Sequence, residues 1–391
     1  MQNKPEWYKA LVPTTLVPAV LFHGETGEEG DHGEGDADDD GEGKKKKNER
    51  RIVWESADII RALEEEFPNT PEMLRDTPEY DAAVKMNDDL TSAGFRFIYA
   101  GRNDTLSEVD ESERRDAFLS ELDRLDAALK VQQQQQQQLE TTSASSDGGD
   151  RMHFRLGADF TAADAIMIPA LERWRIQLPL AVDVDILEGR PALTKWFEAV
   201  DSYAPYSERV MGDEYSWTAT NSMFLRIFGG GEDEPEVAAA IRRSDDAAAR
   251  LTESFAAKAA EEREGDHDDD DDVGTKKKFS REAASKLVSN REAVIADCTR
   301  EDPKSQRHLG RASDVDAADV ALRIVVGVLL SEGDPIARAR ESTLPDMENA
   351  KDGASAARTV AARLCVPRDM GAPAASILRA VLAIVADRLE G

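Results

Sequence analysis

Two short segments near the start of the chain carry groups that could bind a peptide-like ligand. The first is Leu16-Val17-Pro18, at the start of an apolar run. A proline confines the preceding residue to extended geometry and permits a cis bond. The backbone N–H and C=O of Val17 could then project from a sheet edge and pair with an extended ligand. The alternative is an ordinary proline that initiates a strand.

The second segment is Trp54-Glu55-Ser56, where an apolar strand pattern gives way to a helical one. A helix N-terminus offers free N–H groups and the positive end of the helix dipole. A ligand carboxylate would therefore be held by the hydroxyl and N–H of Ser56, and Glu55 could meet an ammonium group. The alternative is that Ser56 only caps the helix.

A small sheet and a helix must position these residues. Residues 16–22 and 51–54 are rich in β-branched and aromatic residues, which predicts two antiparallel strands. The run at 24–50 separates them, and they can still pair because the entropy of loop closure grows only logarithmically with length. An apolar stripe at helical spacing over 59–67 then predicts a helix with Ser56 at its N-cap.

The rest of the chain is predicted to be helical, which gives an α+β fold with a small sheet first and helices behind it. Helical periodicity is clearest at residues 113–129, 161–178, 191–202, 235–262, 280–300, 315–331, 354–364 and 372–389. The last of these segments has a broad apolar face that needs partner helices, so it predicts a helical bundle.

Three low-complexity runs are predicted to be disordered insertions, since their composition cannot bury enough apolar surface to offset the entropy lost on ordering. They are an acidic insertion at 24–50, a glutamine- and serine-rich insertion at 131–150, and an acidic linker at 261–278. The glycines at 229–231 mark a domain boundary.

The charge of the chain and its histidines and cysteines argue against several kinds of partner and binding site. The formal net charge of -30 argues against nucleic acid and anionic membrane partners, because both are bound by clustered Lys and Arg. The five histidines never pair at a metal-ligand spacing, so no metal site is predicted. Cys298 and Cys365 form no disulfide framework, which indicates a reducing compartment such as the cytoplasm.

The order of the ligand-binding motifs resembles the glutathione-binding half of a glutathione S-transferase, in particular the omega and lambda classes. The resemblance is carried by Asn3-Lys4-Pro5-Glu6-Trp7, Val12-Pro13, Leu16-Val17-Pro18 and Trp54-Glu55-Ser56. It implies that Lys4 contacts the glycyl end of glutathione and that Val17, before a cis Pro18, pairs with the cysteinyl backbone. Glu55 and Ser56 would hold the γ-glutamyl end.

The resemblance continues through the helical part of the chain. Phe160-Thr161-Ala162-Ala163-Asp164 resembles the family's capping motif, in which Thr161 caps a helix and Asp164 returns the hydrogen bond. This role is structural. Residues 190–196 also resemble a family segment, with Trp196 expected to pack in the core rather than to contact substrate.

The resemblance implies three parts. Residues 1–70 form a thioredoxin-like glutathione-binding domain that lacks its first strand and helix, and residues 71–228 form an all-helical transferase domain. Residues 235–391 form a helical bundle of unknown role. In the family, the turn between that first strand and helix carries the catalytic cysteine, serine or tyrosine. The catalytic residue is therefore expected upstream of Met1. An incomplete N-terminus also leaves organelle targeting open.

Two functions remain open. One is a glutathione-dependent transferase or thiol reductase, acting on a hydrophobic electrophile or a disulfide with an upstream low-pKa thiolate. The other is a non-catalytic module that binds glutathione or a protein partner. Cys298 and Cys365 lie outside the matching segments and are expected to be buried. The C-terminal helices are the expected surface for a homodimer or a protein partner.

Overall fold

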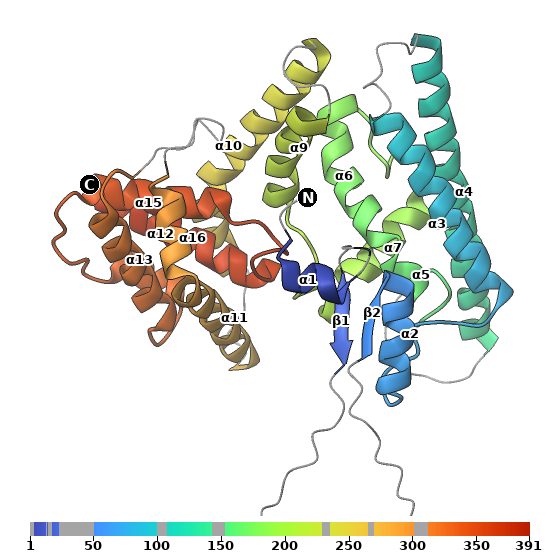
Figure 1. Cartoon of the computed structure of the whole chain (residues 1–391), viewed down its shortest axis with the longest axis horizontal. Coiled ribbons are helices and arrows are strands. Elements are labelled where there is room, and N and C mark those ends of the chain that lie inside the picture. Colours follow the sequence, from blue (N-terminus) through green and yellow to red (C-terminus); the bar gives the residue numbers. More distant parts are fainter. Residues whose placement is uncertain are drawn as a thin grey trace, which may run out of the picture.

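The computed structural model describes residues 4–12, 14, 18–22, 51–99, 108–142, 153–228, 235–264, 270–300 and 312–391. These residues form one small sheet and many helices (Figure 1). The elements are α1 (Glu6–Leu11), β1 (Ala19–Phe22), β2 (Arg51–Trp54), α2 (Ser56–Glu66), α3 (Pro78–Tyr99), α4 (Glu108–Thr142), α5 (Ala162–Ala165), α6 (Ile168–Val182), α7 (Pro191–Asp201), α8 (Ala204–Ser207), α9 (Glu214–Phe228), α10 (Pro235–Glu264), α11 (Asp270–Ser289), α12 (Arg291–Cys298), α13 (Val315–Leu330), α14 (Pro335–Glu341), α15 (Ala350–Arg363) and α16 (Ala372–Glu390).

The two predicted strands pair as an antiparallel hairpin. Ala19 lies opposite Trp54 and Phe22 lies opposite Arg51, so the prediction of this pairing is confirmed. Within the described residues, β1 pairs with β2 alone. The insertion at 24–50 lies outside the described residues.

Helix α2 follows β2 directly, as predicted, but its first turn differs from the prediction. Glu55 occupies the N-cap position and Ser56 is already the first helical residue. The predicted apolar stripe is also only partly buried: Ile59 and Ala62 face inward, whereas Phe67 is exposed. The reason is that α2 packs mainly on β2, so only a narrow face of the helix is covered.

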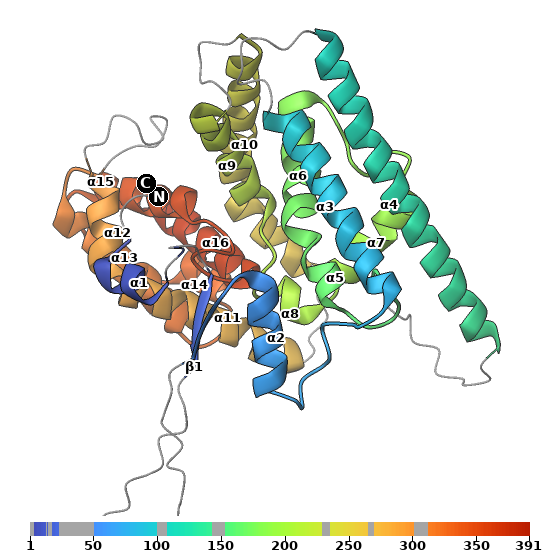
Figure 2. The same cartoon turned by 45° about the vertical axis from the view of Figure 1, so that its right-hand side comes forward.

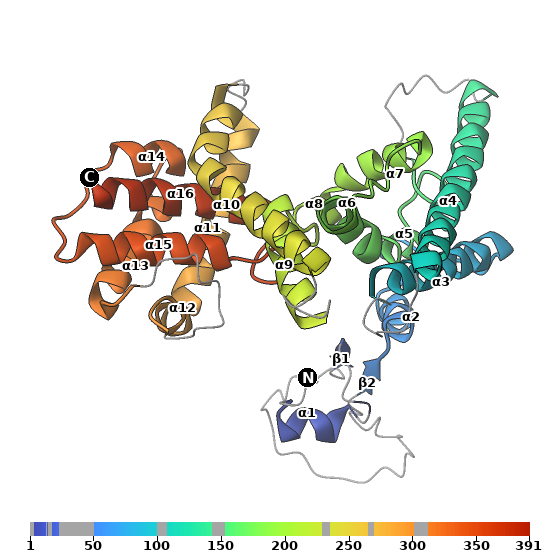
Figure 3. The same cartoon turned by 90° about the horizontal axis from the view of Figure 1, so that it is seen from above.

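Helices α3 to α8 enclose a core of large side chains. Helix α3 packs against α4 (Figure 2), and α6 and α7 lie on the other side of the core (Figures 1 and 3). Phe118 of α4 meets Trp174 of α6 edge-on, with ring centroids 5.1 Å apart. Gly94 of α3 makes room for that indole, because a Cβ at this position would lie 2.3 Å from the Trp174 ring. The absence of a side chain at Gly94 thus fixes how closely α3 approaches α6.

Five predicted helices are confirmed as α7, α10, α13, α15 and α16, with ends shifted by at most four residues. The segment 161–178 instead divides into α5 and α6, because Pro169 in the first turn of α6 has no N–H to continue a preceding helix. The segment 280–300 divides at Asn290 into α11 and α12.

Two of the insertions predicted to be disordered are helical where the structure describes them. Helix α4 continues through the glutamines to Thr142, and the buried amide of Gln133 donates a 2.9 Å hydrogen bond to the carbonyl of Ala192. The acidic linker is helical up to Glu264 and again from Asp270. Composition alone does not predict these helices, because it does not show which residues elsewhere in the chain form contacts and hydrogen bonds with them.

Helices α9 and α10 connect the first helical group to the C-terminal helices. Helix α9 packs on α6 and α10, and α10 also packs on α16, which lies at the centre of the C-terminal group (Figures 1 and 3). The predicted boundary at 229–231 lies outside the described residues. The helices on either side of it pack against each other, so they belong to one continuous structure.

Candidate functional site

The structure brings three of the predicted ligand-binding residues to one end of the sheet. Because Ala19 pairs with Trp54, the preceding Pro18 and the following Glu55 lie at the same end of the hairpin. Ser56 begins α2 at that end, and Pro18, Glu55 and Ser56 are all exposed. Val17 lies outside the described residues.

Glu55 has an unusual backbone conformation. Its φ of 79° and ψ of 126° lie in a region that residues other than glycine rarely adopt. Such a conformation costs roughly 1 to 3 kcal/mol and tends to occur at ligand-binding positions. The turn allows β2 to pass into α2 without an intervening loop, so the carboxylate of Glu55 and the N-terminus of α2 are neighbours.

Among the residues that the structure describes, none caps the N-terminus of α2. The first backbone bond of the helix runs from the N–H of Ile59 to the carbonyl of Glu55, at 2.9 Å. No side chain caps the N-terminus, and within the described residues the N–H groups of residues 56–58 have no acceptor. Free N–H groups at a helix N-terminus form an anion site. Together with the carboxylate of Glu55, this arrangement suits a ligand that carries a carboxylate beside an ammonium group.

Lys4 belongs to a separate segment in front of α1. Its ammonium group lies 5.0 Å from the centre of the Tyr8 ring, which is a cation–π distance. Pro5 then occupies the N-cap position of α1. Lys4 is therefore oriented by α1 rather than by the sheet.

Thr161 and Asp164 form a buried capping box at α5. The N–H of Thr161 donates to Oδ2 of Asp164 at 3.0 Å, while Oδ1 accepts the N–H of Arg155 at 2.6 Å and the indole N–H of Trp196 at 3.0 Å. Burial raises the pKa of Asp164 although these hydrogen bonds act in the opposite direction. The carboxyl joins α5 to α7, and Trp196 is a core residue.

Burial disfavours the thiolate form of both cysteines. Cys298 is 3% exposed, and burial raises the pKa of its thiol to about 12. Cys365 is half-buried, so the expectation of full burial is wrong for it, and burial raises its pKa as well. Reactive cysteines have lowered pKa values that favour the thiolate.

A groove of about 840 Å³ lies between α3 and α4 and is lined in part by Asp89, Phe95, Arg96 and Glu121. The Phe95 ring is 52% exposed and could meet an aromatic or apolar group. Hydrogen bonds from Arg124, at 3.0 Å, and Lys85 hold the pKa of Asp89 below its usual value. The groove thus combines a partly exposed aromatic ring with charged groups of both signs.

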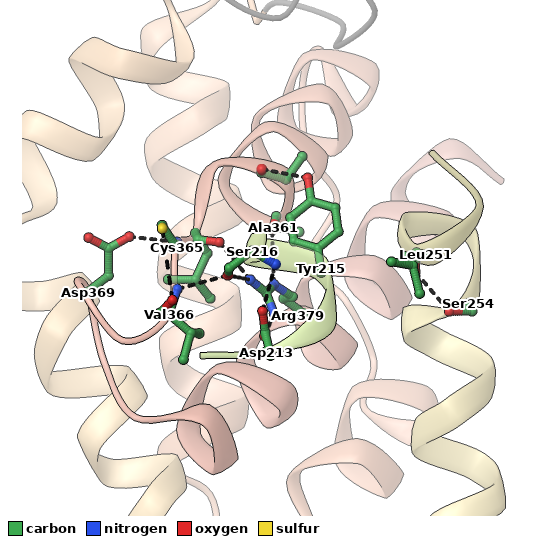
Figure 4. Close-up of polar contacts among 12 residues, drawn as sticks. Asp213, Tyr215, Ser216, Leu251, Ser254, Ala361, Cys365, Val366, Asp369 and Arg379 are labelled. Carbon is green, nitrogen blue, oxygen red and sulfur yellow. Dashed lines mark hydrogen bonds and ion pairs between the residues drawn. The ribbon is translucent and has the colours of Figure 1, made fainter. Parts of the chain in front are cut away.

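A buried polar cluster connects α9 to α15 and α16 (Figure 4). The sequence patterns did not predict it. Arg379 forms an ion pair with Asp213 and donates to the Leu364 carbonyl at 2.6 Å and to Ser216 Oγ at 3.1 Å. The hydroxyl of Tyr215 donates to a carbonyl of α15 at 2.6 Å. The signal in the sequence is Arg379, a charged residue within the otherwise apolar stretch of 377–386. Its role is structural.

Within the described ranges, no cluster of three or more His, Cys, Asp or Glu side chains could hold a metal ion. In the same part of the chain, no helix is both long enough and apolar enough to cross a membrane.

Residues 95–199 match the family model described as "Glutathione S-transferase, C-terminal domain". This segment is similar to that domain. The matched segment runs from the end of α3 into α7 and includes the capping box and the residues of α4 that line the groove. Searches of curated proteins and of solved structures found no significant match. The match lies within the region 71–228 that the sequence motifs assigned to an all-helical transferase domain.

Proposed function

We propose that this chain is a glutathione S-transferase-like protein that binds glutathione at the junction of β2 and α2. The observation that carries the proposal is the turn at Glu55, which places a carboxylate beside the uncapped N-terminus of α2. The γ-glutamyl end of glutathione carries an ammonium group and a carboxylate on one carbon. Glu55 would bind the ammonium group, and Ser56 with the free N–H groups would bind the carboxylate.

The remaining contacts follow from the same proposal. The backbone of Val17, with Pro18 after it, would pair with the cysteinyl part of glutathione, and Lys4 would meet the glycyl carboxylate. Residues 1–70 would then be a thioredoxin-like domain of the omega or lambda type. The family match at 95–199 supports this reading because a helical domain of that kind follows the sheet in chain order.

The reaction would be a glutathione-dependent transfer to a hydrophobic electrophile, or the reduction of a disulfide. The groove beside Phe95 offers an apolar contact for such a second substrate. The cytoplasm, as a reducing compartment, would supply the glutathione.

A non-catalytic binding role is the second candidate. It is favoured by the two thiols of this chain, because burial raises their pKa values and so disfavours the thiolate form that a nucleophile needs. In this case the chain would bind glutathione or a protein partner without turnover. Measured transfer or disulfide reduction by the chain of residues 1–391 would exclude this role.

Retention on glutathione resin tests the proposed site. We expect Ser56→Ala to weaken binding by roughly tenfold, or about 1 to 2 kcal/mol, the range of a hydrogen bond to a charged group. Ser202→Ala is a matched control, because its hydroxyl bonds only within the end of α7. Equal retention of the Ser56→Ala variant and the original chain would contradict the proposal.

A further inference from the structure

Arg155, in the segment between α4 and α5, is a buried cation that forms no ion pair within the described residues. Its side chain is part of a residue only 7% exposed, and its Nε is buried without a hydrogen-bond acceptor. Asp164 attracts the guanidinium, but both oxygens of that carboxylate already accept hydrogen bonds, from the main chain of Arg155 and from Thr161 and Trp196. A buried charge without a partner is costly. The guanidinium therefore has unused capacity to donate hydrogen bonds.

The guanidinium of Arg155 is directed at the thioether of Met86 on α3. Its Nη2 lies 3.5 Å from Sδ of Met86. A thioether sulfur is only a weak acceptor, so this contact offsets little of the cost of burying the charge. Met86 is partly buried at the edge of the core that α3 to α8 enclose, so part of its side chain is open to small solutes. The structure thus places an oxidisable sulfur beside a strong donor that lacks a strong acceptor.

We propose that Met86 is a modification site, where a hydroperoxide oxidises the sulfur and the resulting sulfoxide oxygen accepts hydrogen bonds from Arg155. In this step a lone pair of the sulfur attacks one oxygen of hydrogen peroxide, the O–O bond breaks and an S–O bond forms. The sulfur loses two electrons, and the proton of the transferred oxygen passes to the departing hydroxide, which leaves as water. The sulfur has two lone pairs, and only one of the two sulfoxide epimers directs its oxygen toward the guanidinium.

The oxidation of Met86 should strengthen the fold, which is the opposite of its usual effect. Methionine sulfoxide ordinarily disrupts a core, because it places a polar oxygen among apolar groups. Beside Arg155 that oxygen gains a charged donor, and hydrogen bonds to charged groups are roughly twice as strong as those between neutral groups. The new bond would join α3 to the segment in front of α5, two elements that already pack together. Peroxide would therefore stabilise this contact.

Thermal unfolding of the full chain before and after treatment with hydrogen peroxide tests the proposal, with peptide mass spectrometry to report the oxidised fraction of each of the nine methionines. Met86→Leu isolates the effect of this site, because leucine keeps the apolar volume and is not oxidised. We expect the shift in melting temperature caused by peroxide to be about 2 to 4 °C more positive in the original chain than in Met86→Leu. In Arg155→Leu, which folds without the buried charge, oxidation of Met86 should lower the melting temperature.

The stereochemistry of the sulfoxide tests the role of Arg155 independently of stability. Two classes of methionine sulfoxide reductase each reduce one epimer, so applied to the digested peptides they measure the ratio of the two. Met223 of α9, which is 46% exposed, is the matched control and should yield both epimers. Met86 should yield mainly one in the original chain and both in Arg155→Leu. The proposal is overturned if Met86 stays reduced at doses that fully oxidise Met223, if its oxidation lowers the melting temperature of the original chain, or if its epimers form equally there.

Discussion

Glu55 combines two properties in one residue, a strained backbone and a carboxylate beside a helix N-terminus. Strain of this kind persists only where the surrounding structure imposes it. Here β2 ends at Trp54 and α2 begins at Ser56, so one residue makes the whole turn. The two properties can be separated by substitution, because glycine removes the strain and glutamine removes only the charge.

Glu55→Gly should therefore raise stability and lower glutathione affinity together. We expect the free energy of unfolding to increase by about 1 kcal/mol, since glycine adopts a positive φ without steric strain. Glu55→Gln should leave stability nearly unchanged and also weaken binding. Urea unfolding and glutathione resin measure the two effects. A less stable Glu55→Gly variant would show that the turn is not strained.

Tyr215 gives a pH-dependent prediction. Burial raises the pKa of this buried phenol to about 12, above the ordinary value of 10.0. A raised pKa in the folded state contributes stability that is fully present below pH 10 and is lost as the pH rises through about 12. Tyr215→Phe should lower stability at pH 8 by about 1 kcal/mol and make the fall between pH 10 and 12 shallower. Urea unfolding at pH 8 and pH 11 measures both, with Tyr203→Phe as control.

At the scale of the helix, the patterns set by residues that are close together in the sequence could be predicted. The strand, Glu-Ser and helix order at 51–66 is local, and so is the apolar periodicity of α13 and α16. The path of α4 through its glutamines could not be predicted, because Gln133 finds its acceptor 59 residues away at Ala192. The pairing of Arg379 with Asp213 spans 166 residues and was missed for the same reason.

Replacing two helical glycines by alanine should have opposite effects on stability. Gly94→Ala should destabilise the chain by roughly 1 to 3 kcal/mol, because the added methyl group would overlap the Trp174 ring between α3 and α6. Gly327→Ala should instead stabilise it by up to about 1 kcal/mol, since the methyl group meets open space. Thermal unfolding measures both. Equal shifts of the melting temperature in the two variants would contradict the view that only Gly94 is required by packing.

At the scale of the whole molecule, the C-terminal helices are joined to α9 through a buried contact. Arg379 of α16 is almost fully buried and pairs with Asp213 at the start of α9. Helix α10 adds a second connection, since it packs on α6, α9 and α16. The two parts should therefore unfold together in a single transition.

Arg379→Met tests this connection. Removing one partner of a buried ion pair leaves the other charge uncompensated, and we expect a loss of about 3 to 5 kcal/mol. Arg358→Met is the matched control, because Arg358 pairs with Asp387 on the surface and exposed pairs contribute little. Urea unfolding followed by circular dichroism measures both variants. Similar losses in the two would contradict a special role for the buried pair.

The central claim is that the β2–α2 junction binds the γ-glutamyl end of glutathione. Isothermal titration of the full chain with glutathione and with cysteinylglycine, which lacks that end, tests it most directly. We expect cysteinylglycine to bind at least roughly tenfold more weakly, and Ser56→Ala to weaken the binding of glutathione but not of cysteinylglycine. Equal affinities for the two ligands, or an equal effect of Ser56→Ala on both, would contradict the claim.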